Sequence, residues 1–227
     1  METVLITGAS RGIGLELTKQ FLDLNYKVIS TYRVKPSLAL DTLTSNKNLT
    51  LIELEVTNED SISNLSRTLS GITIDILINN AGVIGPEQQS MAEIKQQDWL
   101  NTFATNSIAP LMVSHAVLPS IQAASKPRIL TISSLMGSIN SDSVGMYAYR
   151  SSKAAVNKVM KILSVELKDQ GVAVCLIHPG WVQTDMGGQQ ADISVEESAT
   201  GILEIACNLT MSQSGHFLTW QGNKLDW

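Results

Sequence analysis

The sequence predicts an α/β fold of the Rossmann type: one doubly wound parallel sheet of about seven strands with helices on both faces. Three observations predict it. Short runs rich in β-branched residues alternate with longer amphipathic segments along the chain. Several runs are apolar on both faces, as parallel strands covered by helices are. No repeat, low-complexity tract or linker divides the chain, so we expect a single dinucleotide-binding domain over residues 1–227.

Seven runs are expected to be the strands of this sheet, at residues 3–7, 27–31, 49–54, 74–78, 128–133, 172–177 and 216–220. The amphipathic segments GLELTKQFLDL and SISNLSRTL, after the first and third runs, are expected to be helices. VIGPEQQSMAEIKQ and the stretch 185–194 have the composition of loops. Ligands of such sheets bind beyond the carboxyl ends of the strands, so residues that directly follow a strand are the candidate site.

Charge and composition exclude several classes of protein. The formal net charge is -5 and no cluster of Lys and Arg stands out, so we expect no nucleic-acid partner. Cys175 and Cys207 lie in apolar or helical patterns and are expected to be small buried side chains in a reducing compartment. The three histidines lack the spacing of a metal site. Without a leader-like start or a run of about 18 apolar residues, we expect a cytoplasmic protein with no membrane partner.

A glycine-rich loop, TGASRGIG, follows the first strand and precedes a helix. Gly8 permits a tight turn, while Gly12 and Gly14 let backbone amides and the helix N-terminus approach a pyrophosphate. Its position favours a dinucleotide site that also includes Ser10, Arg11 and Ile13. The alternative is a turn that needs glycine for its own geometry.

The end of the second strand bears on the choice between NADP and NAD. NAD sites usually place an acid there for the ribose 2′-hydroxyl, whereas this chain has STYRVK. Arg33, with Arg11 from the glycine loop, is placed to pair with a 2′-phosphate, which favours NADP over NAD. The alternative is that Arg33 is an ordinary surface charge.

Two tyrosines and a lysine stand together in GMYAYRSSKAAV. On a helix, Tyr149 and Lys153 are separated by four positions and share a face, whereas Tyr147 points about 200° away from Tyr149. A nearby ammonium favours the phenolate, so we expect Lys153 to lower the pKa of Tyr149. Tyr149 is therefore the candidate acid or base at a substrate oxygen.

Five motifs in this order resemble the short-chain dehydrogenase/reductase family: TGASRGIG, NNAG, SS, YRSSK and HPGWVQTDMGG. They extend over nearly the whole chain. Within the family, SSLMGSI, YAYRSSKAAVN and the tail GHFLTWQGNKLDW are most similar to the sniffer and C-factor type of carbonyl reductase.

The resemblance implies roles for further residues near Tyr149. Ser134 would hydrogen-bond the substrate carbonyl, Lys153 would also hold the nicotinamide ribose, and Asn106 would stabilise a water-linked proton path. Two alternatives stay open: a loop-capping hydroxyl for Ser134 and a helix-kink partner of Pro110 for Asn106. The neighbouring Ser133 is expected to be structural.

The resemblance also implies contacts with the cofactor. Those after the fourth strand would line the adenosine side, and those after the sixth would orient the nicotinamide; they are Asn80, Ala81, Gly82, Pro179, Gly180, Val182 and Thr184. Thr184 has an alternative role as a helix N-cap.

Two departures from the family pattern stand out. Glu55 occupies the position before Val56 where the family usually has aspartate, so its contact with adenine is in doubt although both residues are assigned to the cofactor site. Ser134 and Tyr149 are fifteen positions apart, about two more than is commonest in the family, so the loop between them is longer.

The sequence therefore predicts an NADP-dependent oxidoreductase that transfers hydride between nicotinamide and a carbonyl or alcohol substrate, with Tyr149 as acid or base. One alternative is a binding module that senses NADP occupancy, against which the complete set of Ser134, Tyr149 and Lys153 argues. Another is epimerisation or dehydration, which usually needs a larger C-terminal region. The resemblance leaves a homo-oligomer, dimer or tetramer, open.

Overall fold

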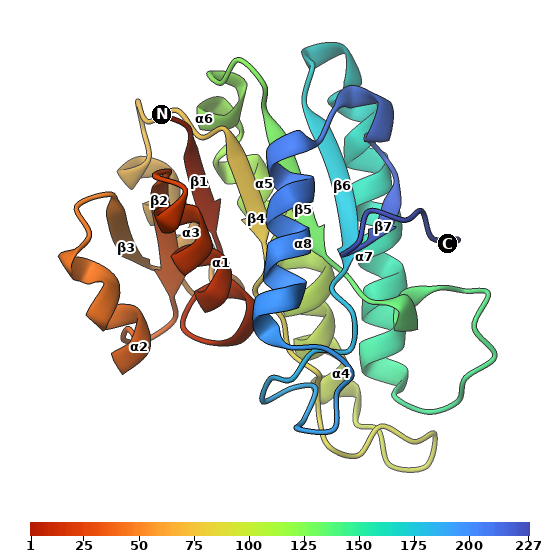
Figure 1. Cartoon of the computed structure of the whole chain (residues 1–227). Coiled ribbons are helices and arrows are strands. Elements are labelled where there is room, and N and C mark those ends of the chain that lie inside the picture. The colour runs from red at the N-terminus through yellow and green to blue at the C-terminus, as the bar shows by residue number, and fades with distance from the viewer.

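One all-parallel sheet of seven strands organises the computed structural model, which describes residues 1–227 (Figure 1). The strand order is β3-β2-β1-β4-β5-β6-β7. The strands are β1 (Thr3–Ile6), β2 (Lys27–Tyr32), β3 (Leu49–Glu53), β4 (Ile76–Asn79), β5 (Arg128–Ile132), β6 (Ala173–His178) and β7 (Phe217–Thr219). The predicted fold class is confirmed, and each strand lies within two residues of its predicted bounds. The largest difference is at β4, where the Asp75 carboxylate accepts a hydrogen bond from the Thr3 amide just before the strand begins.

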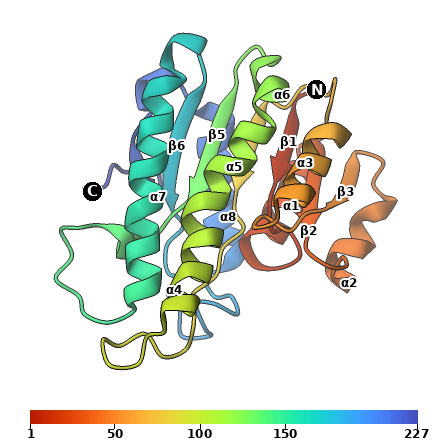
Figure 2. The same cartoon turned by 180° about the vertical axis from the view of Figure 1, so that it is seen from behind.

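Helices cover both faces of the sheet (Figures 1 and 2). They are α1 (Gly12–Asp23), α2 (Leu38–Asp41), α3 (Glu59–Thr68), α4 (Gln96–Phe103), α5 (Ala109–Ala116), α6 (Leu118–Gln122), α7 (Tyr147–Glu166) and α8 (Val195–Asn208). A π-helical segment, Ala104–Ile108, joins α4 to α5. None of these helices is both long enough and apolar enough to cross a bilayer.

Each face of the sheet has its own hydrophobic core. On one face, α1 and α8 bury side chains such as Phe21 and Ile202 against the strands (Figure 1). On the other, α3, α5 and α7 bury Leu65, Val113 and Met160 (Figure 2). The strands are buried on both sides, which explains why their sequences are apolar at nearly every position.

The parallel arrangement brings all the segments that follow the strands to one edge of the sheet, the lower end in Figure 1. The chain order reverses between β1 and β4, which pair directly. The amide of Thr7, just beyond β1, donates to the carbonyl of Ile78 in β4. A ligand site is expected at this switch point.

The C-terminal tail folds back on the last strand. The Leu225 amide donates to the Phe217 carbonyl, and Leu218 forms an antiparallel bridge with Lys224. The Trp227 ring stacks on Phe217 with centroids 5.8 Å apart. Trp227 thus holds the tail against the last strand of the sheet.

Candidate active site

The glycine loop between β1 and α1 has a backbone that only glycine adopts readily. The φ angles are +67° at Gly8 and +54° at Gly12, both in the left-handed region. A Cβ on Gly8 would lie 2.8 Å from the Ala81 Cα. Helix α1 starts directly after this turn, with no side-chain cap from Arg11 and no acidic residue in its first turn. Its first amides are therefore available to an anion such as a pyrophosphate.

Gly14 has a reason to lack a side chain within the protein itself. A Cβ at this position would lie 2.4 Å from the Asn80 Nδ2 and 2.6 Å from the Gly8 carbonyl oxygen. The Asn80 side-chain amide fills that space because it donates to the carbonyls of Thr7 (2.9 Å) and Gly8 (3.0 Å). Gly14 thus makes room for a brace between β1 and the segment after β4.

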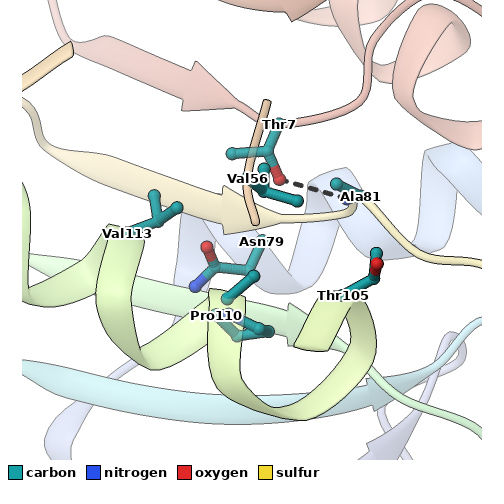
Figure 3. A pocket seen from close by; sticks show the side chains of 8 residues that line it. Thr7, Val56, Asn79, Ala81, Thr105, Pro110 and Val113 are labelled. Carbon is teal, nitrogen blue, oxygen red and sulfur yellow. Dashed lines mark hydrogen bonds between the residues drawn. The ribbon is translucent and has the colours of Figure 1, made fainter. Parts of the chain in front are cut away.

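The same brace ties β1 to the segment after β4. The Thr7 hydroxyl oxygen accepts hydrogen bonds from the amides of Asn80 (3.0 Å) and Ala81 (3.1 Å), the second drawn in Figure 3. Val56 and Ala81, both predicted cofactor residues, line one small recess together with Pro110. The structure therefore brings the segments after β1, β3 and β4 to one place.

Arg33, the predicted ligand of a 2′-phosphate, follows β2 at the same edge and its side chain is 73% exposed. Its Nε lies 3.9 Å from the Glu55 Oε2. The other carboxylate oxygen of Glu55 accepts from the amide (3.2 Å) and hydroxyl (2.9 Å) of Thr57. Glu55 is thus directed at Arg33 and Thr57.

Arg11 forms an ion pair with the segment after β6. Its Nη1 donates to the Asp185 Oδ2 at 2.8 Å, and both side chains are exposed. A Cβ on Gly12 would lie 3.3 Å from the Thr184 Cγ2, so the segment after β6 lies directly on the glycine loop.

Thr184 closes a turn in the segment after β6. Its hydroxyl accepts from the Gly187 amide at 3.1 Å. Helix α8 is capped by Ser194, whose hydroxyl accepts from the Glu197 amide, so the alternative role of Thr184 as a helix cap does not hold. The other predicted residues of this segment are nearby: the Pro179 carbonyl accepts from Ser198, Gly180 has a φ of +88°, and Val182 is buried and bridges to Ile193.

Tyr149 and Lys153 lie on one face of α7, four positions apart as predicted, and they are 8% and 5% exposed. The Lys153 Nζ is 5.8 Å from the centroid of the Tyr149 ring. The Ser134 side chain lies close enough to the Tyr149 hydroxyl to lower its pKa, and the Lys153 ammonium donates to the Ile132 carbonyl at 2.8 Å. Residues from β5, the segment after it and α7 thus meet in a buried cluster.

The pKa values in this cluster differ from our expectation. Burial raises the pKa of Tyr149 above its usual value, and the nearby Ser134 side chain, which lowers this pKa, offsets the rise only in part. The prediction that Lys153 lowers the pKa of Tyr149 is therefore wrong for the protein alone, because the loss of hydration disfavours the phenolate more than the neighbours favour it. Burial also lowers the pKa of Lys153 to about 8. Tyr149 is a neutral phenol at neutral pH.

Tyr147 has a different environment. It is exposed, and its ring lies 6.2 Å from that of Trp99 in α4. The residue four positions later is Ser151 and not a lysine. Only one of the two tyrosines is thus part of the buried cluster.

Asn106 lies in the π-helical segment and is almost fully buried. Its side chain donates to the Val83 carbonyl (2.8 Å) and the Ser152 hydroxyl (3.0 Å), and accepts from the Val83 amide (2.9 Å). Pro110, four positions later, has no N–H, so the Asn106 carbonyl lacks the usual helical donor. Asn106 thus bonds the loop after β4 and lies where Pro110 interrupts the i→i+4 hydrogen bonds of the helix.

Ser134 and Ser133 have different partners. The Ser134 hydroxyl accepts from the Met136 amide at 3.1 Å and lies beside Tyr149, so it caps a turn and also belongs to the buried cluster. The Ser133 hydroxyl donates to Asn157 at 2.5 Å and has a structural role.

Comparison with known proteins assigns the chain to a family. The profile of the short chain dehydrogenases matches residues 2–193. The chain belongs to the short-chain dehydrogenase family. It is therefore an oxidoreductase, and its relatives extend across the full chain.

Three relatives of this family member show how close the similarity is. C-signal of Myxococcus xanthus is 40% identical over 156 residues, which cover 68% of this chain and 93% of that protein. The NADPH-bound carbonyl reductase from chicken fatty liver is 35% identical with a TM-score of 0.93, covering 100% of this chain and 99% of that one. The carbonyl reductase Sniffer of D. melanogaster is 34% identical with a TM-score of 0.94, covering 100% of both chains.

Several buried residues at the site of this short-chain dehydrogenase were not foreseen. Gly137 packs on α7, where a Cβ would lie 2.6 Å from the Lys153 carbonyl carbon. The Ser152 hydroxyl links Asn106 to the Tyr149 carbonyl. Gln89 is 6% exposed and bonds the start of α7. The glycine in SSLMG was a usable signal for Gly137, whereas nothing in the sequence marks Gln89.

Proposed function

We propose that this short-chain dehydrogenase transfers hydride between NADP and a carbonyl or alcohol substrate, with Tyr149 as the acid or base. The supporting observation is a buried phenol that has Ser134 beside it and the Lys153 ammonium 5.8 Å from its ring centroid. Lys153 is only 5% exposed. Burial of a cation costs free energy, so a buried lysine is a candidate for a functional role.

The residues around the glycine loop fit an NADP cofactor. The uncapped N-terminus of α1 suits the pyrophosphate, and Arg33 suits the 2′-phosphate. Arg11 is ion-paired with Asp185, which would bring it near the pyrophosphate and away from the 2′-phosphate. Val182 and Thr184 would orient the nicotinamide carboxamide, as the family resemblance implies. When bound, NADPH supplies the hydride that reduces the carbonyl carbon.

The residues of the buried cluster would handle the proton. In the reducing direction, the neutral phenol of Tyr149 donates its proton to the carbonyl oxygen while Ser134 holds that oxygen by a hydrogen bond. The phenol of Tyr149 is neutral at neutral pH, so the proton that this step needs is present. The Lys153 ammonium then stabilises the phenolate that remains. In oxidation the same steps run in reverse.

Proton resupply is assigned to the segment around Asn106. Pro110 supplies no i+4 donor to the Asn106 backbone carbonyl, which would bond a water molecule of the proposed proton path. The Asn106 side chain, held by Val83 and Ser152, fixes this carbonyl in place.

The walls of the site favour a partly apolar substrate. Exposed apolar side chains stand in each of the three segments that surround the cluster: Ile84 after β4, Leu135 after β5, and Trp181 and Met186 after β6. Apolar walls with a few converging polar groups are typical of small-molecule sites.

A panel of ketones and aldehydes tests the proposal. The loss of reduced nicotinamide is followed by its absorbance, with Tyr149→Phe as the matched control. Turnover of at least one carbonyl compound by the wild type and not by Tyr149→Phe is the expected result. Tight NADPH binding with no turnover across the panel would instead favour a sensor of NADP occupancy.

A further inference from the structure

The helix that carries Tyr149 has no N-terminal cap from its own chain segment. Helix α7 begins after Met146, which has a φ of 53° and a ψ of 44°, and no side chain next to it caps the helix. The first helical bond is from the Arg150 amide to the Met146 carbonyl. The three amides before Arg150 therefore need partners from elsewhere, and one of them belongs to Tyr149.

Gln89, from the loop after β4, supplies two of these partners. Its backbone carbonyl accepts from the Tyr147 amide at 3.3 Å. Its side-chain Oε1 accepts from the Tyr149 amide at 3.0 Å, across 60 positions of sequence. Gln89 thus acts as the N-cap of α7 from a distant loop, and it is one of the few polar residues in that loop to be buried.

The other end of the same amide holds the loop itself. The Gln89 Nε2 donates to the carbonyls of Ile84 and Pro86, both at 2.8 Å. Val83 is fixed at the start of the loop by Asn106. All three polar positions of the Gln89 side chain are therefore used, and they join a wall of the site to the helix that carries the phenol.

We propose that Gln89 is a positioning residue that sets where the Tyr149 hydroxyl lies relative to Ser134 and Lys153. The inference rests on the proposed function, since it takes Tyr149 as the proton donor. Small displacements of a reacting group cost large factors in rate. At this point the side chain must donate two hydrogen bonds and accept one, which a neutral amide can do. A carboxylate can only accept hydrogen bonds, and an apolar side chain can neither donate nor accept them.

The first experiment compares Gln89→Ala with Gln88→Ala, whose side chain is exposed and makes no hydrogen bond to the rest of the chain. For Gln89→Ala we expect kcat for carbonyl reduction to fall about 10- to 100-fold, with the Kd for NADPH unchanged because the glycine loop is not touched. Gln88→Ala should match the wild type. Independently of activity, hydrogen exchange of the Tyr149 amide should become faster in Gln89→Ala alone.

The second experiment uses Gln89→Glu and pH. A carboxyl group accepts from the Tyr149 amide in either state but donates to the loop carbonyls only when protonated. The ratio of its kcat to that of the wild type should therefore fall as pH rises through the pKa of the introduced group, which burial raises. A residue that only keeps the protein folded would give a ratio independent of pH once the folded fraction is corrected by the melting curve.

Three results would overturn the proposal: a folded Gln89→Ala variant with kcat within about twofold of the wild type, unchanged exchange of the Tyr149 amide, or a pH-independent ratio for Gln89→Glu. If Gln89→Ala does not fold, Gln89→Glu decides alone. A failure of the proposed function is distinguishable, because the wild type and Tyr149→Phe would then have equal rates while the exchange experiment still reports on the cap.

Discussion

Two proposed parts of the site are built in opposite ways: the cofactor region, made of the glycine loop with Arg33 and Glu55, and the catalytic cluster, made of Ser134, Tyr149 and Lys153. In the cofactor region the charged groups are exposed: the Arg11 and Arg33 side chains are 79% and 73% accessible. In the catalytic cluster every functional side chain is below 9%. The first region relies on backbone shape and solvated charge, and the second on buried hydrogen bonds.

This difference predicts which substitutions leave folding unchanged. An exposed charge interacts weakly with its neighbours because water and salt screen it, so its replacement alters affinity for a ligand and hardly alters folding. A buried polar group has a perturbed pKa and fixed partners, so its replacement alters chemistry and stability together. The predictions below test that division, beginning with the residue that departs from it.

Gly14 belongs to the cofactor region but is buried, and Gly14→Val should have the largest effect. The new side chain would overlap the Asn80 Nδ2 and the Gly8 carbonyl, both held by hydrogen bonds. We expect little folded protein and no NADPH binding, measured by thermal melting and by fluorescence titration of NADPH. Gly71→Ala, where nothing lies within 4 Å, is the control and should bind NADPH normally. A folded Gly14→Val protein with an unchanged titration would contradict this account.

Tyr149→Phe should lower kcat for carbonyl reduction by at least about 10²-fold, since it removes the positioned proton donor and keeps the ring. NADPH binding should be largely retained. The readout is kcat at saturating NADPH together with the Kd of the cofactor.

Tyr147→Phe is the internal control, two positions earlier on the same helix. Its ring is exposed beside Trp99, so we expect less than about a threefold change in kcat and effects mainly on KM. Loss of activity in Tyr147→Phe with normal turnover by Tyr149→Phe would show that the wrong tyrosine was assigned.

Lys153 should make stability depend on pH. Burial lowers its pKa in the folded protein to about 8 from the usual value of 10.5, so between these values the unfolded chain binds more protons. The free energy of unfolding of the cofactor-free protein should therefore rise with pH through this window, by up to about 3 kcal/mol.

Urea denaturation between about pH 7.5 and 9.5 measures this contribution, below the range in which Tyr149 ionises. Lys153→Met should lose the rise, whereas Lys158→Met, at an exposed position of the same helix, should keep it. An equal slope in Lys153→Met and the wild type would mean that the ammonium is better hydrated than its burial indicates.

Arg33→Asp should have the smallest effect on folding. It would remove the proposed charge-assisted contact with the 2′-phosphate, and because Arg33 is exposed we expect the weak end of the usual range, about 1.5–2 kcal/mol, or about a 10- to 30-fold weaker Kd for NADPH. NADH affinity and melting temperature should change little. Equal losses for NADPH and NADH would remove Arg33 from the 2′-phosphate site.

The sequence was sufficient for the parts of the molecule that depend on local pattern. All seven strands, the glycine loop and the shared helix face of Tyr149 and Lys153 follow from periodicity and spacing, which act over a few residues. The two φ angles above +50° at Gly8 and Gly12 agree with the need for glycine there.

The parts that depend on distant contacts were not predictable. The cap from Gln89 to Tyr149 spans 60 positions and leaves no periodic signal. The pKa of Tyr149 was predicted in the wrong direction because spacing reveals a neighbouring cation and not how far both groups are removed from water. The ion pair of Arg11 with Asp185 was also not predicted, because Asp185 is 174 positions away in the sequence.

The tail that follows β7 has a consequence for handling the protein. An uncovered strand at the end of a sheet presents free amides and carbonyls on which another polypeptide can pair, a common route to aggregation. Here the Leu225 amide bonds the Phe217 carbonyl, and the Trp227 ring stacks on the Phe217 ring, so the tail covers the edge strand β7. A variant truncated after Thr219, or carrying a rigid fusion there, should aggregate on storage although its catalytic cluster is intact, and size-exclusion chromatography over several days would reveal it.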